Sequence, residues 1–260
     1  MLAERTMIMN FYTFGSESAP VMLLIHGVIC PWQIWDDVAA RYQNDYRVIV
    51  VELDGHTQDA PTEFVSVGQE AQRIEDWLLE NGMGELDTVF GLSMGGGIAG
   101  LLWQNGRIAI KNLVLDGAPL VPAGRFVTGI ITGFYTDIIR KSQQRDPKTL
   151  ENCKKNFLPE KYLEKYLKVA DNMSEPVMKN VTLSICANAL SKGLSTDSMR
   201  ILYLYGTGSS EMLSKKSVKF LKKYYPQVRL LCSKGTGHAE LFCYHPQEWI
   251  TAVDAFLAEK

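Results

Sequence analysis

The sequence lacks the short motifs that mark the commonest cofactor and metal sites. No Gly-x-Gly-x-x-Gly opens a helix after the first apolar run, and neither Gly-x-x-x-x-Gly-Lys-Ser/Thr nor His-Glu-x-x-His occurs. The 5 cysteines among 260 residues are scattered and form no Cys-x-x-Cys pair. We therefore predict a protein without cofactor or metal, whose free thiols are typical of a reducing compartment.

A strong charge of either sign and a long apolar run are also missing. The chain has 27 Lys and Arg against 29 Asp and Glu, a formal net charge of −2 that disfavours nucleic acid as a partner. No apolar run approaches the roughly 18 residues that would indicate stable membrane insertion. Glu4, Arg5 and Asn10 interrupt the first residues, which do not resemble a secretory signal. We therefore expect a cytoplasmic protein.

Short β-rich runs alternate with longer amphipathic segments in most of the chain. Two runs, Val21–Ile25 and 47–51, are almost entirely apolar, as in strands buried on both faces. The alternation predicts an α/β fold with a mostly parallel, doubly wound sheet. An edge strand in a hairpin is expected at 7–14. The other expected strands are 88–90, 113–115, 201–205 and 228–231, and the expected helices are 32–42, 67–81, 96–105, 215–224 and 246–258.

This alternation stops between residues 120 and 199. The segment contains helical stretches such as 163–170, separated by prolines, and no convincing strand. The charge-rich part, 140–155, has the pattern of a solvated helix face. We predict that 120–199 is a helical cap inserted into a core formed by 1–119 and 200–260.

The most informative motif is Gly-Leu-Ser-Met-Gly at residues 91–95. It follows an apolar run and precedes a small-residue segment with a helical pattern, as a nucleophile elbow requires. The sharp turn strains the serine backbone, and the flanking glycines keep side chains away from it. Because the bare pattern also occurs by chance, its place between strand and helix carries the prediction that Ser93 is a nucleophile.

A serine hydroxyl needs an adjacent general base near neutral pH. Of the four histidines, His238 is best placed, since it follows the last expected strand in a flexible Lys-Gly-Thr-Gly-His loop. His26 ends a strand, where a backbone-positioning role is more natural, while His56 and His245 lie in a loop and at a helix start. We therefore predict that His238 is the base.

The base in turn needs a carboxylate that holds its tautomer. The acid should follow the nucleophile and precede the histidine, which excludes Asp54 and Asp59. Glu211 and Asp116 remain, each after an expected strand whose end shares the sheet edge with Ser93. Glu211 could instead favour a helix dipole, and Asp116 could cap a turn. The sequence slightly favours Glu211.

A developing oxyanion needs donors fixed in advance. The amide of Met94, directly after the nucleophile and at the start of a helix, is one candidate. The second should come from the loop after the first buried strand, where Gly27 lets the backbone turn inward. We assign this donor to the amide of Val28, with Gly27 as the alternative.

Together these motifs resemble the α/β-hydrolase superfamily over essentially the whole chain. The resemblance rests on His26-Gly27 followed by Trp35, on Asp-Gly-His at 54–56, on the elbow, and on Gly-His at 237–238 ahead of Pro246. It implies that the first glycine loop supplies an oxyanion donor, that Ser93 attacks and that His238 is the base. It also implies that the helical insertion is a lid whose inner face sets substrate choice.

Two departures from the superfamily pattern stand out. The usual Gly-x-x-Asp reads Gly206-Thr207-Gly208-Ser209, so Glu211 would have to substitute two residues later, or Asp116 would serve instead. The usual Gly-His-Gly reads Gly-His-Thr at 55–57, which affects that loop and not the chemistry.

Three functions remain open from the sequence. The first is a cofactor-independent serine hydrolase that cleaves an ester, thioester or amide through an acyl-enzyme. The second is the same fold used as a lyase, an acyltransferase or a C–C hydrolase, and the third is a catalytically silent ligand-binding protein.

Aromatic residues in the expected cap suggest a small-molecule substrate with an apolar acyl or alkyl part, although aromatics at helical spacing more often form core. Near the serine, Trp32, Trp35 and Met94 could line the floor of the site. The cap aromatics are Phe126, Phe134, Tyr135, Phe157 and Tyr162.

Overall fold

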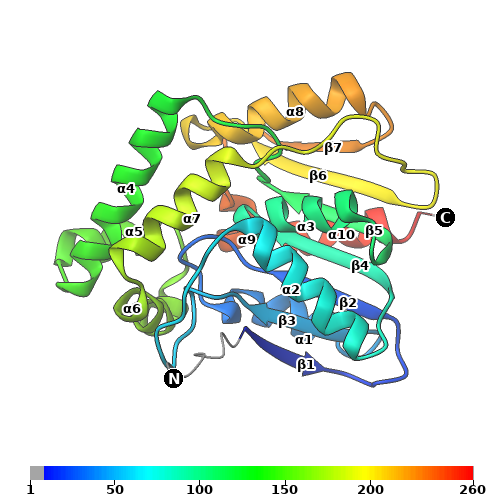
Figure 1. Cartoon of the computed structure of the whole chain (residues 1–260), viewed down its shortest axis with the longest axis horizontal. Coiled ribbons are helices and arrows are strands. Elements are labelled where there is room, and N and C mark those ends of the chain that lie inside the picture. Colours follow the sequence, from blue (N-terminus) through cyan, green and yellow to red (C-terminus); the bar gives the residue numbers. More distant parts are fainter. Residues whose placement is uncertain (1–8, 260) are drawn as a thin grey trace, which may run out of the picture.

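The computed structural model describes residues 9–259, which build one seven-stranded sheet with helices on both faces (Figure 1). The strand order is β1-β3-β2-β4-β5-β6-β7, and every neighbouring pair is parallel except β1 with β3. The predicted mostly parallel sheet is confirmed. The strands are β1 Asn10–Phe14, β2 Val21–Ile25, β3 Arg47–Glu52, β4 Glu85–Leu92, β5 Ala109–Asp116, β6 Arg200–Gly206 and β7 Arg229–Ser233.

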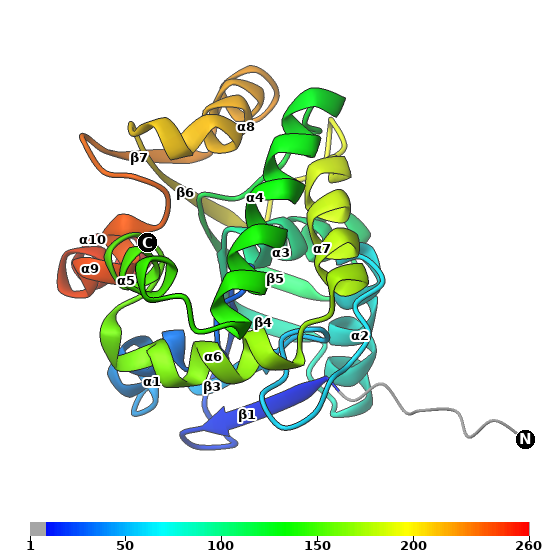
Figure 2. The same cartoon turned by 90° about the vertical axis from the view of Figure 1, so that its left-hand side faces the viewer.

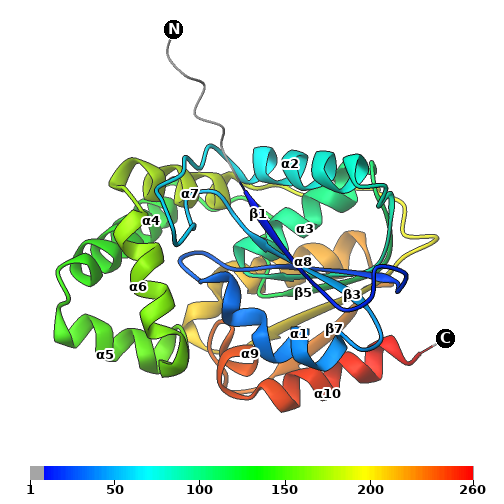
Figure 3. The same ribbon diagram turned by 90° about the horizontal axis from the view of Figure 1, so that it is seen from below.

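Helices cover the sheet in two layers. Figure 3 shows α2 and α3 on one face and α1, α9 and α10 on the other. The core helices are α1 Asp36–Tyr42, α2 Val67–Glu80, α3 Met94–Asn105, α8 Met212–Tyr224, α9 Glu240–Tyr244 and α10 Pro246–Leu257, with short 3-10 turns η1 Trp32–Trp35 and η3 Ser209–Glu211.

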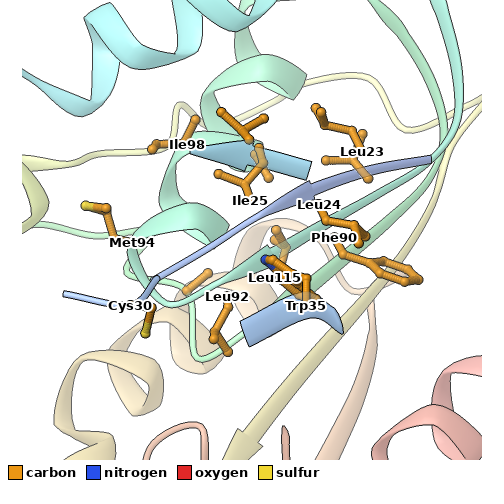
Figure 4. Close-up of a cluster of buried hydrophobic side chains, with 14 of the residues drawn as sticks. Leu23, Leu24, Ile25, Cys30, Trp35, Phe90, Leu92, Met94, Ile98 and Leu115 are labelled. Carbon is orange, nitrogen blue, oxygen red and sulfur yellow. The ribbon is translucent and has the colours of Figure 1, made fainter. Parts of the chain in front are cut away.

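The central strands are apolar on both sides because both sides are covered. Figure 4 shows Leu23 and Ile25 of β2 on the side of Ile98 in α3, while Leu24 lies with Phe90 on the opposite side. All five of these side chains are fully buried. This continuous burial is why β2 and β3 read as unbroken apolar runs in the sequence.

The edge strand differs in one respect from the expectation for residues 7–14. Within that range, β1 begins at Asn10, and residues 7 and 8 lie outside the described part of the chain. β1 pairs with β3, from Asn10 opposite Glu52 to Phe14 opposite Val48, and not with the next strand along the chain. The predicted hairpin is therefore wrong. Because β2 is already paired on both sides, with β3 and β4, only the free edge of β3 is left for β1.

Residues 120–199, which we call the cap segment, contain helices and no strand. The helices are α4 Arg125–Gln143, α5 Pro147–Asn156, η2 Glu160–Tyr162, α6 Leu163–Asn172 and α7 Glu175–Ala187.

The charge-rich stretch 140–155 is not one helix face. α4 ends at Gln143, Arg145 has a φ of 57°, and α5 begins at Pro147 with the Asp146 carboxylate accepting the amide of Thr149. A proline disfavours helical conformation at the preceding residue, and the aspartate side chain satisfies a free helix amide. The chain therefore turns between two separate helices.

Hydrogen bonds close the base of the cap segment and attach it to the core. The amide of Leu190 donates to the carbonyl of Leu120 at 2.9 Å, and the Asn188 side chain donates to the carbonyl of Pro119 at 2.8 Å. Asn172 and Asn180 donate to carbonyls in the loop between β3 and α2. The cap segment is thus fixed at both its ends and along one side.

Two further findings concern the whole described chain. Among residues 9–259, no helix combines the length and apolarity needed to cross a bilayer. All five cysteines are free thiols, and four of them are buried.

Candidate active site

Ser93 occupies a strained turn between β4 and α3. Its φ of 51° and ψ of −113° are uncommon for a residue with a side chain. A Cβ at Gly91 would come within 2.5 Å of the Gly95 carbonyl oxygen, and one at Gly95 would collide with the Ile25 carbonyl. Only glycine fits at these two positions, which explains the spacing of the motif.

The imidazole of His238 lies directly against this serine. Its Nε2 is 2.8 Å from Ser93 Oγ, within hydrogen-bond distance, although 145 residues separate the two in the chain. His238 comes from the loop after β7, where its own amide donates to the Ser210 hydroxyl. The His238 side chain is 26% exposed, so the pair is open to solvent on one side.

Glu211 is the carboxylate that faces the other nitrogen of this imidazole. Its Oε2 lies 3.5 Å from His238 Nδ1, and its Oε1 accepts the amide of Gly206 at 3.0 Å. Neither Oε2 nor Nδ1 has a closer polar partner among the described residues. The missing aspartate of the Gly-x-x-Asp pattern is thus offset by a glutamate in the short turn η3, whose longer side chain reaches back to His238.

Glu211 and His238 stabilise each other's charged forms. Burial alone would raise the pKa of Glu211, but the facing His238 and hydrogen bonds from Ser214 and Gly206 lower it below its ordinary value. Burial alone would likewise lower the pKa of His238, but Glu211 and the charge of Asp116 raise it. Glu211 is therefore ionised and His238 is a stronger base than an isolated histidine.

Asp116 ends the neighbouring strand but has a different partner. Its Oδ2 accepts the indole Nε1–H of Trp249 at 2.8 Å. Burial is the main cause that raises the pKa of Asp116 to about 7, and the nearby Glu211 charge adds to it. The backbone carbonyl of Asp116 accepts the amide of Ser93 at 2.7 Å, which ties the turn at Ser93 to β5.

Sequence reasoning did not identify Gly117, which lies directly beneath the imidazole. Its φ is 62°, and a Cβ there would be 2.6 Å from His238 Cε1. Trp249 in α10 and Ser210 in η3 were also missed. An Asp-Gly pair after an expected strand could have indicated Gly117, whereas the two other residues have no local sequence signal.

The loop after β2 is held in a strained conformation beside Ser93. His26 Nδ1 lies 2.8 Å from the Gly27 carbonyl and Nε2 accepts the amide of Leu53, so the ring links the loop to the residue after β3. Burial lowers the pKa of His26 to about 3, which keeps it neutral. Ile29 has a φ of 55°, rare for a β-branched residue. A Cβ at Gly27 would lie 3.4 Å from that of Ser93, so the loop passes close to the serine.

The two candidate oxyanion donors differ in how the structure places them. Met94 is the first residue of α3 and is fully buried directly after Ser93, so its amide lies at the helix N-terminus. Val28 lies in the strained loop, 7% exposed, between Gly27 and Ile29. Both backbones therefore come from segments that contact the serine turn.

Several aromatic residues lie elsewhere than expected. Trp32 stacks on Tyr12 of β1 at the sheet edge, with ring centroids 4.0 Å apart, and Trp35 packs edge-on to Trp249 and Phe242 in the core. Both rings are thus enclosed by other aromatic side chains, Trp32 at the sheet edge and Trp35 in the buried core.

The five cap aromatics do not form one wall. Phe126 is 81% exposed and Phe134 is 48% exposed, whereas Tyr162 is buried beside Lys161. Tyr135 and Phe157 are partly buried against the hydrophobic core. Of the five, only these two are both partly open to solvent and packed against the core.

Among residues 9–259, no cluster of three or more His, Cys, Asp or Glu side chains could hold a metal ion. Near Ser93, Glu211 faces His238 and Asp116 accepts the indole N–H of Trp249. The arrangement brings together a hydroxyl, an imidazole and a carboxylate.

No protein-family model matches this sequence, and comparison with curated proteins gives no significant match. Solved structures are nevertheless similar. A protein from Desulfitobacterium hafniense, provisionally assigned to the α/β-hydrolase family, has a TM-score of 0.76 at 19% identity, over 95% of this chain and 100% of that one.

Two esterases show the same likeness. An esterase from Exiguobacterium antarcticum has a TM-score of 0.75 at 18% identity, with 96% of each chain covered. A thermophilic esterase from Thermogutta terrifontis has a TM-score of 0.72 at 18% identity, over 96% of this chain and 92% of that one. This chain therefore has the α/β-hydrolase fold, as its motifs predict.

Proposed function

We propose that this protein is a cofactor-independent serine hydrolase that cleaves an ester, thioester or amide through an acyl-enzyme. The observation that carries the proposal is the 2.8 Å distance between Ser93 Oγ and His238 Nε2 on a strained strand-to-helix turn. The likeness to esterases of the same fold supports it.

In the first half of the reaction, Ser93 Oγ attacks the substrate carbonyl carbon and gives its proton to His238 Nε2. For Nε2 to accept this proton, the neutral ring carries its hydrogen on Nδ1, the atom that faces Glu211. Glu211 then stabilises the imidazolium that forms. When the tetrahedral intermediate collapses, the bond to the leaving group breaks, and the leaving group takes the proton from Nε2.

In the second half, water takes the place of the leaving group. His238 removes a proton from this water as its oxygen attacks the acyl carbon, and the Ser93 ester bond breaks with return of the proton to Oγ. In both halves the carbonyl oxygen becomes negative, and we assign its stabilisation to the amides of Met94 and Val28.

Two aromatic residues of the cap segment bear on the substrate class. Tyr135 and Phe157, partly buried between cap segment and core, support a small molecule with an apolar acyl or alkyl part. The cap segment would then act as the lid over that part. A series of model esters of increasing acyl length tests this, because an apolar wall gives a rise in kcat/KM with each added methylene until the space is filled.

The main experiment is labelling with a fluorophosphonate, which reacts with an activated serine. The wild-type chain should be labelled, and Ser93→Ala and His238→Ala should each abolish labelling. Ser16→Ala, in an exposed loop before β2, is the matched control and should be labelled like the wild type.

Other results would change the assignment. Labelling that persists in Ser93→Ala would contradict the nucleophile, and a wild-type chain that is never labelled would favour a silent ligand-binding protein. Full labelling beside very weak turnover of all model esters would favour a lyase, an acyltransferase or a C–C hydrolase.

A further inference from the structure

One face of α4 presents large apolar side chains to solvent. Phe126, Ile130 and Phe134 are 81%, 55% and 48% exposed, and their spacing of four residues places them in a row along the helix. We call these three residues the apolar row. The opposite face of α4 is already used, since it packs on α7 and contains the buried Ile139.

Two glycines lie within this row. A Cβ at Gly129 or Gly133 would meet no atom within 4 Å, so nothing in the fold requires glycine there. Each glycine in a helix interior costs roughly 0.5–1 kcal/mol relative to alanine. Because these glycines have no side chains, they do not cover the three large side chains of the row.

A second observation, independent of the first, is a concentration of positive charge on α8. This helix has five lysines and no acidic residue, and Lys216, Lys219, Lys222 and Lys223 lie near no carboxylate among the described residues. Lys215 is held by the carbonyls of Thr207 and Gly208, and the Lys223 ammonium lies over the ring of Tyr224. The amino groups of Lys216, Lys219 and Lys222 are therefore available to an external negative charge.

These two features lie at the same end of the molecule. Figures 1 and 2 both show α8 and the amino-terminal turns of α4 at the top. Met212, at the start of α8, adds a further exposed apolar side chain, and Arg125 precedes Phe126. One broad surface could contact both helices at once.

The distribution of charge along the chain indicates the kind of partner. The cap segment has twelve Lys and Arg against eight Asp and Glu, whereas the rest of the chain has fifteen against twenty-one. A second copy that covered the apolar row would bring two positive cap segments together, which opposes association. A surface that is negative in charge and apolar underneath satisfies both features.

We propose that this end of the protein docks peripherally on an anionic lipid bilayer. The apolar row enters the boundary between head groups and acyl chains, and the α8 lysines contact the anionic head groups. Such docking requires no membrane-spanning helix and is independent of the proposed hydrolytic activity.

The test is co-sedimentation of the full chain with vesicles. Phosphatidylcholine vesicles with about one third phosphatidylserine should bind the wild type, and binding should weaken steeply with added salt. Pure phosphatidylcholine vesicles should bind it far less. The triple variant Phe126→Ser, Ile130→Ser, Phe134→Ser should lose at least about tenfold in partitioning. Its melting temperature should fall only slightly, because Phe126 and Ile130 are exposed and Phe134 alone packs on another ring, that of Phe157.

Matched control variants test whether binding depends on these particular residues and not on net charge or exposed apolar area in general. Lys219→Gln with Lys222→Gln should weaken binding by about fivefold for each lysine. Lys165→Gln with Lys168→Gln on α6 makes the same change in net charge and should have little effect. Val65→Ser with Leu79→Ser, two exposed apolar residues of the core, should also have little effect.

Three outcomes would overturn the proposal. One is a wild type that binds no anionic vesicle, and another is an equal loss from the α6 and α8 lysine pairs. The third is a dimer, seen by sedimentation velocity, that the triple variant dissociates while vesicle binding stays absent. In that case a second copy covers the apolar row.

Discussion

The ends of β5 and β6 lie side by side, and each places a buried acid near His238. Asp116 is 5% exposed and Glu211 is 1% exposed, so burial hardly distinguishes them. Their partners do. Asp116 accepts a neutral indole N–H, whereas Glu211 faces an imidazole that can become positively charged.

Because of this difference in partner, the pKa values of Asp116 and Glu211 shift in opposite directions. Burial raises the pKa of Asp116 to about 7, since the indole only partly compensates for lost hydration. The pKa of Glu211 is lowered despite burial, because the facing imidazole stabilises its charge. We therefore propose different roles for the two acids, and the following predictions test these roles and the position of His238.

The largest effect should come from Glu211→Gln. Removing the charge that orients His238 and stabilises its protonated form should lower kcat on a model ester by on the order of 10⁴. Asp116→Asn, the matched change on the neighbouring strand, should cost less than about tenfold. Equal and mild losses in the two variants would show that neither acid orients the base.

Gly117→Ala should lower kcat by on the order of 10², because the added methyl group would displace the His238 ring by about an ångström. Gly106→Ala is the control: it has a similar φ of 64° but open space where a Cβ would lie. Both variants should lose similar stability. Equal kcat values for the two would contradict the contact with His238.

The pH dependence of kcat/KM should move in a defined direction. His238 acts as a base only when neutral, so activity is lost as pH falls through its raised pKa, above the ordinary value of 6.5. Glu211→Gln should move this acidic limb down by on the order of one pH unit, and Asp116→Asn by less. A limb that moves up in Glu211→Gln would reverse the assigned interaction.

The smallest effect concerns stability. The folded pKa of Asp116, about 7, exceeds its ordinary value of 3.8, so the folded state holds a proton that the unfolded state has lost in this window. Stability from this group is present at low pH and declines as pH rises toward 7. Asp116→Asn should therefore melt on the order of 5 °C above the wild type near pH 8, and at the same temperature near pH 4. Melting curves across this range measure the difference.

Local patterns were sufficient to predict the sheet and the serine turn. The apolar runs of β2 and β3 reflect burial on both faces, and Gly91 and Gly95 mark a place where only glycine fits. Such constraints act within a few residues and leave a direct trace in the sequence.

Features that depend on distant neighbours left no such trace. Nothing near Asp116 indicates that an indole from α10 binds it, so the sequence could not separate it from Glu211. The hairpin was expected because β1 and β2 are adjacent in the chain, although β3 offers the free edge. Pro147 marks the break between α4 and α5 in the sequence, whereas the charge pattern of 140–155 continues across it.

The way the cap segment is attached has a consequence for how this fold can change. Every side chain that contacts Ser93 or His238 comes from outside residues 120–199, and two hydrogen bonds, Asn188 to Pro119 and Leu190 to Leu120, close the base of the segment. The helices between those two bonds can therefore change in sequence while Ser93, His238 and Glu211 keep their places.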